Sequence, residues 1–501
     1  MYNQRVKKVI SNLSTPGETL SQRAVRGGFW VLSLRIVQQL FNLGRLIILA
    51  RILSPNDFGL MGIALLTMST LETFSQAGLQ AALIQKKEDI HSHLDATWTF
   101  LILRGVLLFG ILYLIAPYAA AFFEAPAAKP IIQVIGLAML LQAFTNIGVI
   151  YFQKDLEFNK EFLYQFAGTL ADFAVAVSAV LILRNVWALV FGLLAGNAAR
   201  CVVSYFIHPY RPHFSSDLGK AKELFRFGRW ILGSSIVIFL ATQGDDIFLG
   251  KVLGATALGF YQMAFRIGNM PSSEFTGVIG KVAFPAYSKL QTTTRQLREA
   301  YLRTVIFSTF ISVPLAGLIV VLAPLFAQVF LGEKWLPIVG PLQILAVSGM
   351  FRSIAGTGGA MFKAIGKPKL DFNMNTTRLI VIILTIYPLT MLGGISGTAF
   401  SVLLGIVAGC FIWVFASTKE IEASLKDFFV VLCPPVVGTL IMCAFTLFIL
   451  NMINFLDNQL LIFIIGVIVS ISIYSTILLI IEKQSKYKVL QELKFILKNL
   501  R

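Results

Sequence analysis

Charged side chains are scarce in this 501-residue sequence: only 13% of its residues are Asp, Glu, Lys or Arg, whereas 56% are hydrophobic. The mean hydropathy is +0.78. A soluble domain carries about 25% charged residues, which cover its surface. The composition therefore excludes a soluble globular protein and predicts an integral membrane protein.

Cysteine and histidine are also rare, with four of each. All four cysteines fall inside predicted membrane helices without metal-ligand spacing, so they predict packing rather than disulfides or a metal site. The short cluster His91, His93 and Asp95 ("HSHLD") lies on a predicted loop, where solvated side chains are the ordinary interpretation. We predict no catalytic residue, no metal and no bound cofactor.

What the sequence does have is a series of apolar stretches of about 20 residues, the length of a helix that crosses a bilayer. They predict an all-α, polytopic membrane protein with about 14 transmembrane helices. The predicted spans are 27–50, 59–84, 95–118, 130–152, 160–184, 186–206, 228–250, 257–287, 303–330, 336–365, 369–391, 393–416, 428–451 and 459–481.

The residues responsible for the net charge of +17 lie mostly in the predicted loops and tails. With a cytoplasmic N-terminus, 29 of the 42 Lys and Arg residues lie in loops or tails assigned to the inside, and five lie in outside loops. Cytoplasmic loops carry such an excess of positive charge, so the pattern predicts a multi-pass protein of the cytoplasmic membrane with both termini inside. Topology thus explains the basic charge without a nucleic-acid partner.

An internal repeat divides the chain. Residues 26–64 align without a gap on residues 226–264, and 13 of the 39 positions are identical, including Arg26 with Arg226 and Gly44 with Gly244. Six predicted spans separate the two copies, and an even number means that both copies cross the membrane in the same direction.

The repeat predicts two parallel six-helix lobes around a central cavity, as in secondary transporters. The predicted parts are a cytoplasmic tail (1–26), the N-lobe (27–206), a cytoplasmic linker (207–227), the C-lobe (228–416), two extra helices (428–481) and a basic amphipathic tail on the inner membrane surface (482–501).

Many charges lie inside the predicted spans, where an unpaired charge costs at least about 2.5 kcal/mol, so they usually face protein or water. For Arg200, Lys281 and Arg378, which lie near inside ends, we expect the side chains to extend to the interface. The remaining arginines are Arg35, Arg45, Arg104, Arg266 and Arg352, and the acids are Glu72, Asp172, Asp245, Asp246 and Glu274.

The repeat places Arg45 over Asp245. We therefore predict that Arg45 pairs with Asp245 or Asp246 across the lobes as an outer gate. The acids as a set are candidates for helix pairing or for H⁺ or Na⁺ coupling. Glu274 lies in a stretch interrupted by Pro271, Gly277, Gly280 and Pro285, which predicts a broken helix that lines a cavity.

With these features the chain resembles the polysaccharide flippases (O-antigen and colanic-acid type) of the multidrug, oligosaccharidyl-lipid and polysaccharide exporter superfamily. The segments that carry the resemblance include "LARILSPNDFGL" (49–60), "FSQAGLQAALIQKKE" (74–88), "LGATALGFYQMAF" (253–265) and "LGEKWLPIVGPLQIL" (331–345). Arg45 in "GRLIILARI" matches an arginine in the first helix of the related lipid II flippases.

The resemblance implies a non-enzymatic transporter of the inner membrane that moves an undecaprenyl-pyrophosphate-linked oligosaccharide from the inner to the outer leaflet by alternating access. The five arginines are then candidate ligands of the pyrophosphate, because guanidinium binds phosphate oxygens bidentately. Membrane lipids and polysaccharide polymerase or chain-length proteins are the implied partners of a monomeric transporter.

Two alternatives stay open. Multidrug exporters share the implied fold, but they favour cationic substrates, which a cavity rich in arginine would repel. A membrane glycosyltransferase usually has a large outside loop with paired acids, and only Asp245 and Asp246 favour that class here.

Overall fold

The computed structural model describes residues 20–75, 91–155, 157–215, 218–270, 283–284, 286–453 and 455–484. Every regular element in these residues is a helix, and nine of the helices within them are long and apolar enough to cross a membrane. The prediction of an all-helical, multi-pass membrane protein is therefore confirmed. The total of 14 helices, the lobe layout around a central cavity and the orientation of the termini stay predictions.

The chain folds as two compact units, Met1–Ile236 and Val237–Arg501, and α11 (Leu218–Gly268) continues from one into the other. Unit 1 contains α2 (Leu20–Ile52), α3 (Pro55–Ser75), α5 (His91–Phe122), α6 (Ala128–Ile135), α7 (Leu137–Ala143), α8 (Ile150–Lys154), α9 (Phe158–Leu183) and α10 (Trp187–Ile207). Unit 2 contains α13 (Thr294–Phe326), α14 (Val339–Ala364), α15 (Pro368–Glu420), α16 (Leu425–Met452) and α17 (Gln459–Gln484).

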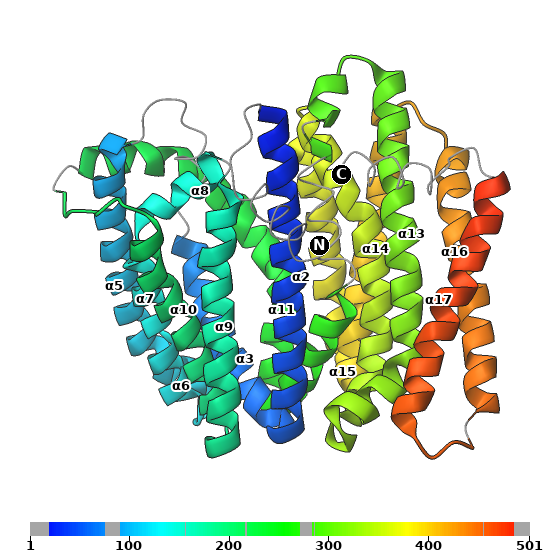
Figure 1. Cartoon of the computed structure of the whole chain (residues 1–501), viewed down its shortest axis with the longest axis horizontal. Helices are drawn as coiled ribbons and strands as arrows, with labels where there is room; N and C mark the ends of the chain where they lie inside the picture. The colour runs from blue at the N-terminus through cyan, green and yellow to red at the C-terminus, as the bar shows by residue number, and fades with distance from the viewer. Residues whose placement is uncertain are drawn as a thin grey trace, which may run out of the picture. The chain divides into compact units, whose positions relative to one another are not determined.

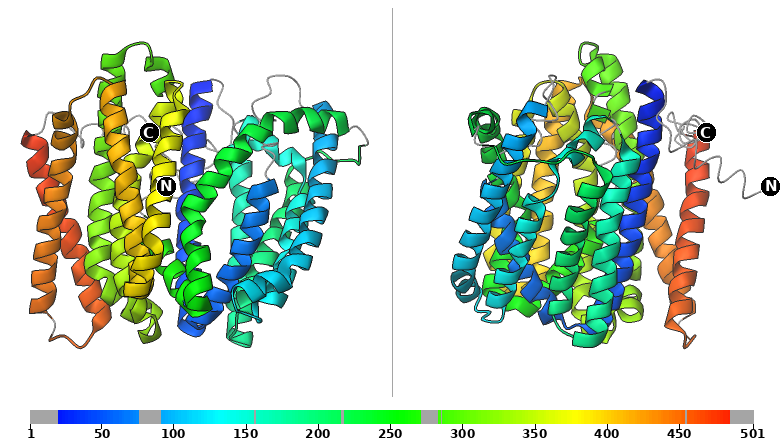
Figure 2. Two further views of the ribbon diagram at one scale, coloured as in Figure 1. Left: turned by 180° about the vertical axis from the view of Figure 1, so that it is seen from behind. Right: turned by 60° about the vertical axis from the view of Figure 1, so that its left-hand side comes forward.

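In unit 1, α9 packs along both α10 and α2 (Figure 1). In unit 2, α13 packs against α14 and α16, and α16 and α17 lie side by side as the orange and red pair in Figure 2. The core of unit 2 includes a buried hydrogen bond from Nε1 of Trp413 to the hydroxyl of Tyr301, 2.7 Å long. This bond satisfies the indole N–H of a large buried ring.

Two glycines interrupt long helices at or near the predicted gaps between spans. Gly254 has φ 80° within α11, and Gly394 has φ 56° within α15. Only glycine adopts these angles without a steric penalty from Cβ. Gly254 falls between the predicted spans 228–250 and 257–287, and Gly394 is the second residue of the predicted span 393–416, two residues beyond the predicted gap.

The predicted span 130–152 is wrong as a single helix. Helical structure from Ala128 ends at Ala143, and Asn146 adopts an extended backbone conformation with ψ 116°. The side chain of Asn146 accepts a hydrogen bond from the backbone N–H of Gly148 at 2.9 Å and thereby starts a 3₁₀ turn (Ile147–Val149). A buried Asn that bonds its own backbone competes with the helix, which hydropathy does not detect.

Asp95 has a structural role. Its Oδ1 accepts hydrogen bonds from the hydroxyl of Tyr210 at 2.6 Å and from the backbone N–H of His213 at 2.8 Å. These bonds attach the loop after α10 to the start of α5. No group of three potential metal-ligating His, Cys, Asp or Glu side chains is found within the described ranges.

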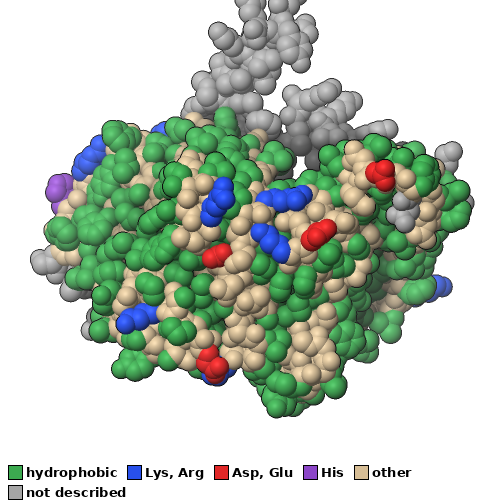
Figure 3. All heavy atoms as spheres, turned by 90° about the horizontal axis from the view of Figure 1, so that it is seen from below, with side chains coloured by type: hydrophobic (Ala, Val, Ile, Leu, Met, Phe, Trp, Pro, Cys, Tyr) green, Lys and Arg blue, Asp and Glu red, His purple; other side chains and the backbone are tan. Residues whose placement is uncertain are grey.

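Hydrophobic side chains also cover much of the surface. Ile182 on α9 is 80% exposed and Leu392 on α15 is 86% exposed. Figure 3 views the end of the molecule at which α2 ends and α3 begins, and only a few charged side chains interrupt the hydrophobic ones there. Apolar exposure on this scale is expected when lipid surrounds the helices.

Candidate functional site

Arg45 and Asp172 form an ion pair inside unit 1. Arg45 lies on α2 and Asp172 on α9, with 3.1 Å between Nη2 and Oδ1, and the two side chains are only 15% and 19% exposed. Nε of Arg45 is buried and has no hydrogen-bond partner among the described residues. The sequence had suggested Asp245 or Asp246 as the partner of Arg45. That contact would join the two units, and it stays a prediction.

Three glycines allow α9 and α10 to approach closely around these charges. A Cβ on Gly192 would lie 2.6 Å from Oδ1 of Asp172, and a Cβ on Gly168 would lie 2.3 Å from Nε of Arg200. Gly196 follows Gly192 by one turn, and a Cβ there would lie 2.9 Å from Cβ of Asp172. Small residues four apart are a pattern of close helix packing in membranes. The segment "GLLAG" (192–196) is therefore a sequence signal for this site, and a search for charged residues alone did not find it.

Arg104 and Glu72 lie together at the end of α3. Nε of Arg104 donates to the carbonyl of Ser75 at 3.1 Å, and Nη2 donates to Oγ of Ser75 at 2.8 Å and to the carbonyl of Glu72 at 3.4 Å. The guanidinium also interacts electrostatically with the Glu72 carboxylate. Arg104 thus satisfies carbonyls at the C-terminal end of a helix, where positive charge is favourable.

The other predicted residues are less informative. Arg35 is half-buried on α2, ten residues before Arg45, and Arg266 is exposed in the last turn of α11. Glu274 lies outside the described residues, and so does Lys281.

Unit 2 contains a buried cluster of charges, which we call the C-unit cluster: Asp245, Asp246, Tyr261, Arg352 and Arg378. The two aspartates are 2% and 8% exposed, and Arg378 is 8% exposed. The hydroxyl of Tyr261 donates to Oδ2 of Asp245 at 2.5 Å. Asp245 interacts electrostatically with both arginines of the cluster.

Three helices build the C-unit cluster. Both aspartates lie on α11 before its break at Gly254, and Tyr261 lies on the same helix beyond the break. Arg352 comes from α14 and packs its guanidinium over the ring of Phe265, with Cζ 5.1 Å from the ring centroid. Arg378 comes from α15. The cluster therefore combines two acidic side chains from one helix with two basic side chains from two other helices.

Several polar atoms of the C-unit cluster are buried without a hydrogen-bond partner among the described residues. They are Oδ1 of both aspartates and Nε and Nη2 of both arginines. Buried polar groups are normally paired with protein, water or an ion. The cluster therefore retains capacity for a further polar ligand, while its charges balance one another.

The expectation for Arg378 is wrong. It was predicted to extend to the inside interface, whereas it is buried and interacts with Asp245. The sequence analysis did not identify Tyr261, because a tyrosine in an apolar helix usually packs against its neighbours without a functional role. Tyr261 lies 15 residues after Asp246, and the helix breaks between them at Gly254. Helical spacing therefore could not predict that Tyr261 lies beside the aspartates.

The fold is similar to that of solved transporters. The lipid II flippase MurJ in an inward closed conformation superposes with a TM-score of 0.75 at 15% sequence identity, covering 91% of this chain and 99% of MurJ. An inward-facing multidrug resistance MATE family transporter superposes with a TM-score of 0.63, and the superposition covers 79% of this chain and 98% of the transporter chain. These likenesses concern the fold.

Sequence relatives share the greater part of the chain. The lipopolysaccharide biosynthesis protein WzxC of Escherichia coli (strain K12) is 27% identical over 390 residues, which are 77% of this chain and 78% of WzxC. The teichuronic acid biosynthesis protein TuaB of Bacillus subtilis (strain 168) is 27% identical over 320 residues, 64% of this chain and 66% of TuaB.

A family model also matches the chain directly. The polysaccharide biosynthesis protein family matches residues 48–340, which is more than half of the sequence. This match shows that the chain belongs to the polysaccharide biosynthesis protein family.

Proposed function

We propose that this protein carries a polyprenyl-pyrophosphate-linked oligosaccharide from the inner to the outer leaflet of the cytoplasmic membrane by alternating access. Family membership supports a transporter of lipid-linked oligosaccharide. The name of WzxC refers to lipopolysaccharide and that of TuaB to teichuronic acid, and both are built from sugars. The solved MurJ is a lipid II flippase of the same fold.

The buried guanidiniums carry the proposal for the pyrophosphate. Arg45 and Arg352 each hold at least one buried N–H group without a hydrogen-bond partner among the described residues. A pyrophosphate oxygen is a strong acceptor for such groups, and guanidinium presents its donors in a fork that fits phosphate. Arg45 and Arg352 are therefore the first candidates to bind the head group.

The proposed substrate-binding set also includes three arginines with a smaller contribution to binding: Arg35, Arg104 and Arg266. Three contacts from Arg104 go to the end of α3, so its guanidinium already has protein acceptors. Arg35 and Arg266 are more accessible than the C-unit cluster, which suits a role in the approach of an anionic head group.

The acids are proposed to control the cycle. Asp172 forms an ion pair with the Arg45 guanidinium in this structure, and an arriving pyrophosphate would compete with Asp172 for that guanidinium. Asp246 is proposed as a coupling group for H⁺ or Na⁺, because its Oδ1 is buried without a partner among the described residues. Glu72, Asp245 and Glu274 complete the proposed gate and coupling set.

Binding of inorganic pyrophosphate to the purified protein tests the ligand assignment. We expect pyrophosphate to raise the melting temperature of the wild type, and Arg352→Lys to weaken this binding roughly 10- to 100-fold, the loss expected for charge-assisted hydrogen bonds. Lysine keeps the charge balance of the C-unit cluster but lacks the fork. Arg295→Gln, at a side chain that is 82% exposed, is the control and is expected to bind as the wild type does.

Transport is then measured in proteoliposomes with an undecaprenyl-pyrophosphate-linked oligosaccharide. The wild type and Arg295→Gln are expected to move it between leaflets, whereas Arg45→Gln and Arg352→Lys are expected to move it slowly. Equal transport by all four proteins would refute the arginine assignment. No transport by the wild type would refute the proposed function.

The aspartate pair that favoured a glycosyltransferase in the sequence does not have the geometry of a catalytic site. Asp245 and Asp246 are buried, and Asp245 bonds to Tyr261 rather than facing an open loop. A pair of catalytic acids must reach its substrate. The likeness to multidrug transporters concerns the fold alone, and the arginines disfavour a cationic substrate.

A further inference from the structure

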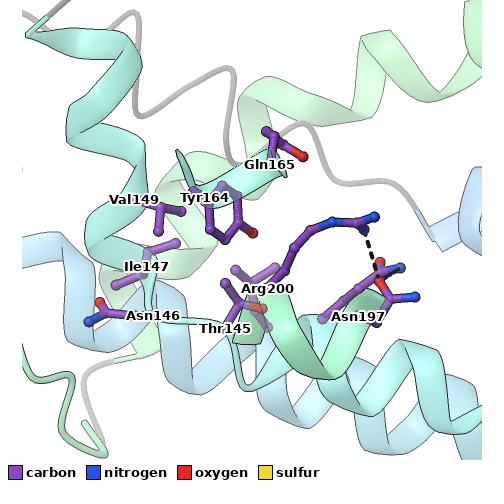
Figure 4. A pocket seen from close by; sticks show the side chains of 10 residues that line it. Thr145, Asn146, Ile147, Val149, Tyr164, Gln165, Asn197 and Arg200 are labelled. Atoms are coloured by element: carbon purple, nitrogen blue, oxygen red, sulfur yellow. Dashed lines mark hydrogen bonds between the residues drawn. The ribbon is translucent and has the colours of Figure 1, made fainter. Parts of the chain in front are cut away.

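Unit 1 contains a polar cavity that the proposed pyrophosphate ligands do not line (Figure 4). Its volume is about 250 Å³, and it lies between α5, α7, the turn at 145–149, α9 and α10. Seven of its ten lining residues are polar: Gln142, Thr145, Asn146, Tyr164, Gln165, Asn197 and Arg200. Such a concentration of polar groups is costly among apolar helices and indicates a functional site.

Arg200 and Asn197 form the centre of the cavity wall. Figure 4 shows the Arg200 side chain reaching over toward Asn197, and Nη1 of Arg200 lies 3.4 Å from Oδ1 of Asn197. Gln142 donates to the same oxygen at 3.3 Å. Both distances exceed the usual N–H···O range of about 2.7 to 3.2 Å, so the bonds are weak and a ligand hydroxyl can replace them at little cost. Nε of Arg200 is buried and has no hydrogen-bond partner in the described parts of the chain.

The backbone makes room for this arginine. Gly168 on α9 faces the Arg200 side chain, and any Cβ there would overlap it. Asn197 is held by a bond from its Nδ2 to the carbonyl of Leu193 at 2.9 Å. Arg200 was expected to extend to the membrane interface, but the structure directs its guanidinium to Asn197 within the cavity.

The donors and acceptors in the cavity are mixed. Carboxamides present both kinds of group, whereas a phosphate site requires donors almost alone. The lining contains one cationic side chain and no carboxylate, which fits neither a diphosphate nor a metal ion. Sugar hydroxyls donate and accept at once, and the ring of Tyr164 offers an apolar surface to a pyranose face.

The volume limits the ligand to a small group. About eight water molecules would fill 250 Å³ at roughly 30 Å³ each. Pockets for whole ligands are larger, about 300 to 1,000 Å³. The cavity therefore suits a single sugar ring rather than an entire oligosaccharide.

Its position suits the start of transport. Most of the lining residues come from the end of α7, the turn after it, the beginning of α9 and the last three turns of α10. The charge distribution predicts that this end of unit 1 faces the cytoplasm. A head group entering from the inner leaflet would meet this cavity early.

We propose that the cavity is a saccharide subsite that holds one sugar ring of the lipid-linked oligosaccharide, an inference that rests on the proposed function. The ring binds through its hydroxyls to Gln142, Asn197 and Arg200. The pyrophosphate binds elsewhere, at the guanidiniums described above. The cavity thereby distinguishes a glycosylated lipid from the bare polyprenyl pyrophosphate.

The first test compares two lipids in proteoliposomes: undecaprenyl-pyrophosphate-linked oligosaccharide and undecaprenyl pyrophosphate without sugar. Gln142 is exposed, so Gln142→Ala is expected to fold. We expect this variant to slow transport of the glycosylated lipid about five-fold, as for one lost hydrogen bond, and to leave the bare lipid unaffected. Gln291→Ala, the same change at an exposed position outside the cavity, is expected to affect neither lipid.

Equal slowing of both lipids, or no slowing of either, would overturn the saccharide subsite. If the wild type moved neither lipid, the proposed function would fail, and a second measurement would still decide the subsite. Methyl glycosides of common hexoses are added at roughly 100 mM, which detects even very weak sites. At least one is expected to raise the melting temperature of the wild type but not that of Arg200→Gln. Stabilisation by none of the glycosides, or equal stabilisation of Arg200→Gln, would overturn the proposal.

Discussion

The C-unit cluster predicts a strong energetic coupling between Asp245 and Arg378. The intact cluster has two aspartates and two arginines, so its charges balance. Arg378→Gln leaves an excess negative charge in the buried site, and Asp245→Asn leaves an excess positive charge. Leaving a buried charge without compensation costs about 3 to 5 kcal/mol. The double variant restores the balance.

We therefore expect each single variant to lower the free energy of unfolding by about 3 to 5 kcal/mol. The double variant is expected to lose less than the sum of the two by about 2 kcal/mol, which lies in the range measured for residues that share a network. Unfolding is followed by tryptophan fluorescence as SDS is added to protein in mixed micelles, and the buried Trp335 and Trp413 in unit 2 report on it.

An exposed ion pair of the same unit provides the matched control. Nζ of Lys363 lies 3.3 Å from Oδ2 of Asp371, and the two side chains are 58% and 18% exposed. Solvent screens such a pair, so its coupling in the cycle Lys363→Gln with Asp371→Asn is expected to be at most about 1 kcal/mol. If Asp245 and Arg378 were additive within about 0.5 kcal/mol, or coupled no more strongly than the control, charge balance in the C-unit cluster would be refuted.

Three further predictions concern other parts of the chain. Gly192→Ala places Cβ 2.6 Å from Oδ1 of Asp172, so we expect a loss of about 1 to 3 kcal/mol in the free energy of unfolding, measured in the same micelles. Asp246→Asn removes a group proposed to couple transport to an ion, so we expect transport by this variant to become independent of an imposed pH or Na⁺ gradient in proteoliposomes. Burial and the nearby positive charge of Lys160 lower the pKa of His208, whose Nδ1 accepts from the backbone N–H of Tyr210 at 3.1 Å. The unfolded chain binds this proton more readily, so stability is retained above about pH 6.5 and falls below it, and replacing His208 by Gln is expected to remove that part of the pH dependence of the melting temperature.

Much of the fold was predictable because the bilayer imposes a single length and a single kind of backbone on its spans. Gly254 falls in a predicted gap between spans, Gly394 lies two residues from one, and α9 and α10 coincide with predicted spans to within two residues. The break at Asn146 escaped prediction because hydropathy sums over about 20 residues, whereas one side chain that bonds to its own backbone ends a helix locally.

The sequence predicted which charges lie inside helices but only part of their contacts. The cost of burying a charge singles out such residues, so Arg45, Asp172, Asp245 and Arg352 were all candidates, and their functional roles stay a prediction. Partners depend on which helices pack together, and helix packing depends on small residues such as Gly192 rather than on charge. The partner of Arg45 was therefore sought in the repeat, where the sequence offered an alignment, and the structure also places Asp172 beside it.

The two units use equivalent positions of the repeat in opposite ways. Position 45 carries a cation that pairs with an acid on α9, and position 245 carries an acid that bonds to Tyr261 and interacts with cations from α14 and α15. The charges at positions 45 and 245 thus each interact with an opposite charge within their own unit. A transporter that moves its lobes against each other would separate any ion pair that joined them and would expose two desolvated charges at once. Interactions that stay within one unit avoid this cost during the proposed cycle. Nε of Arg45 and Nε and Nη2 of Arg352 are buried without a hydrogen-bond partner among the described residues, and these are the groups that we propose bind the pyrophosphate.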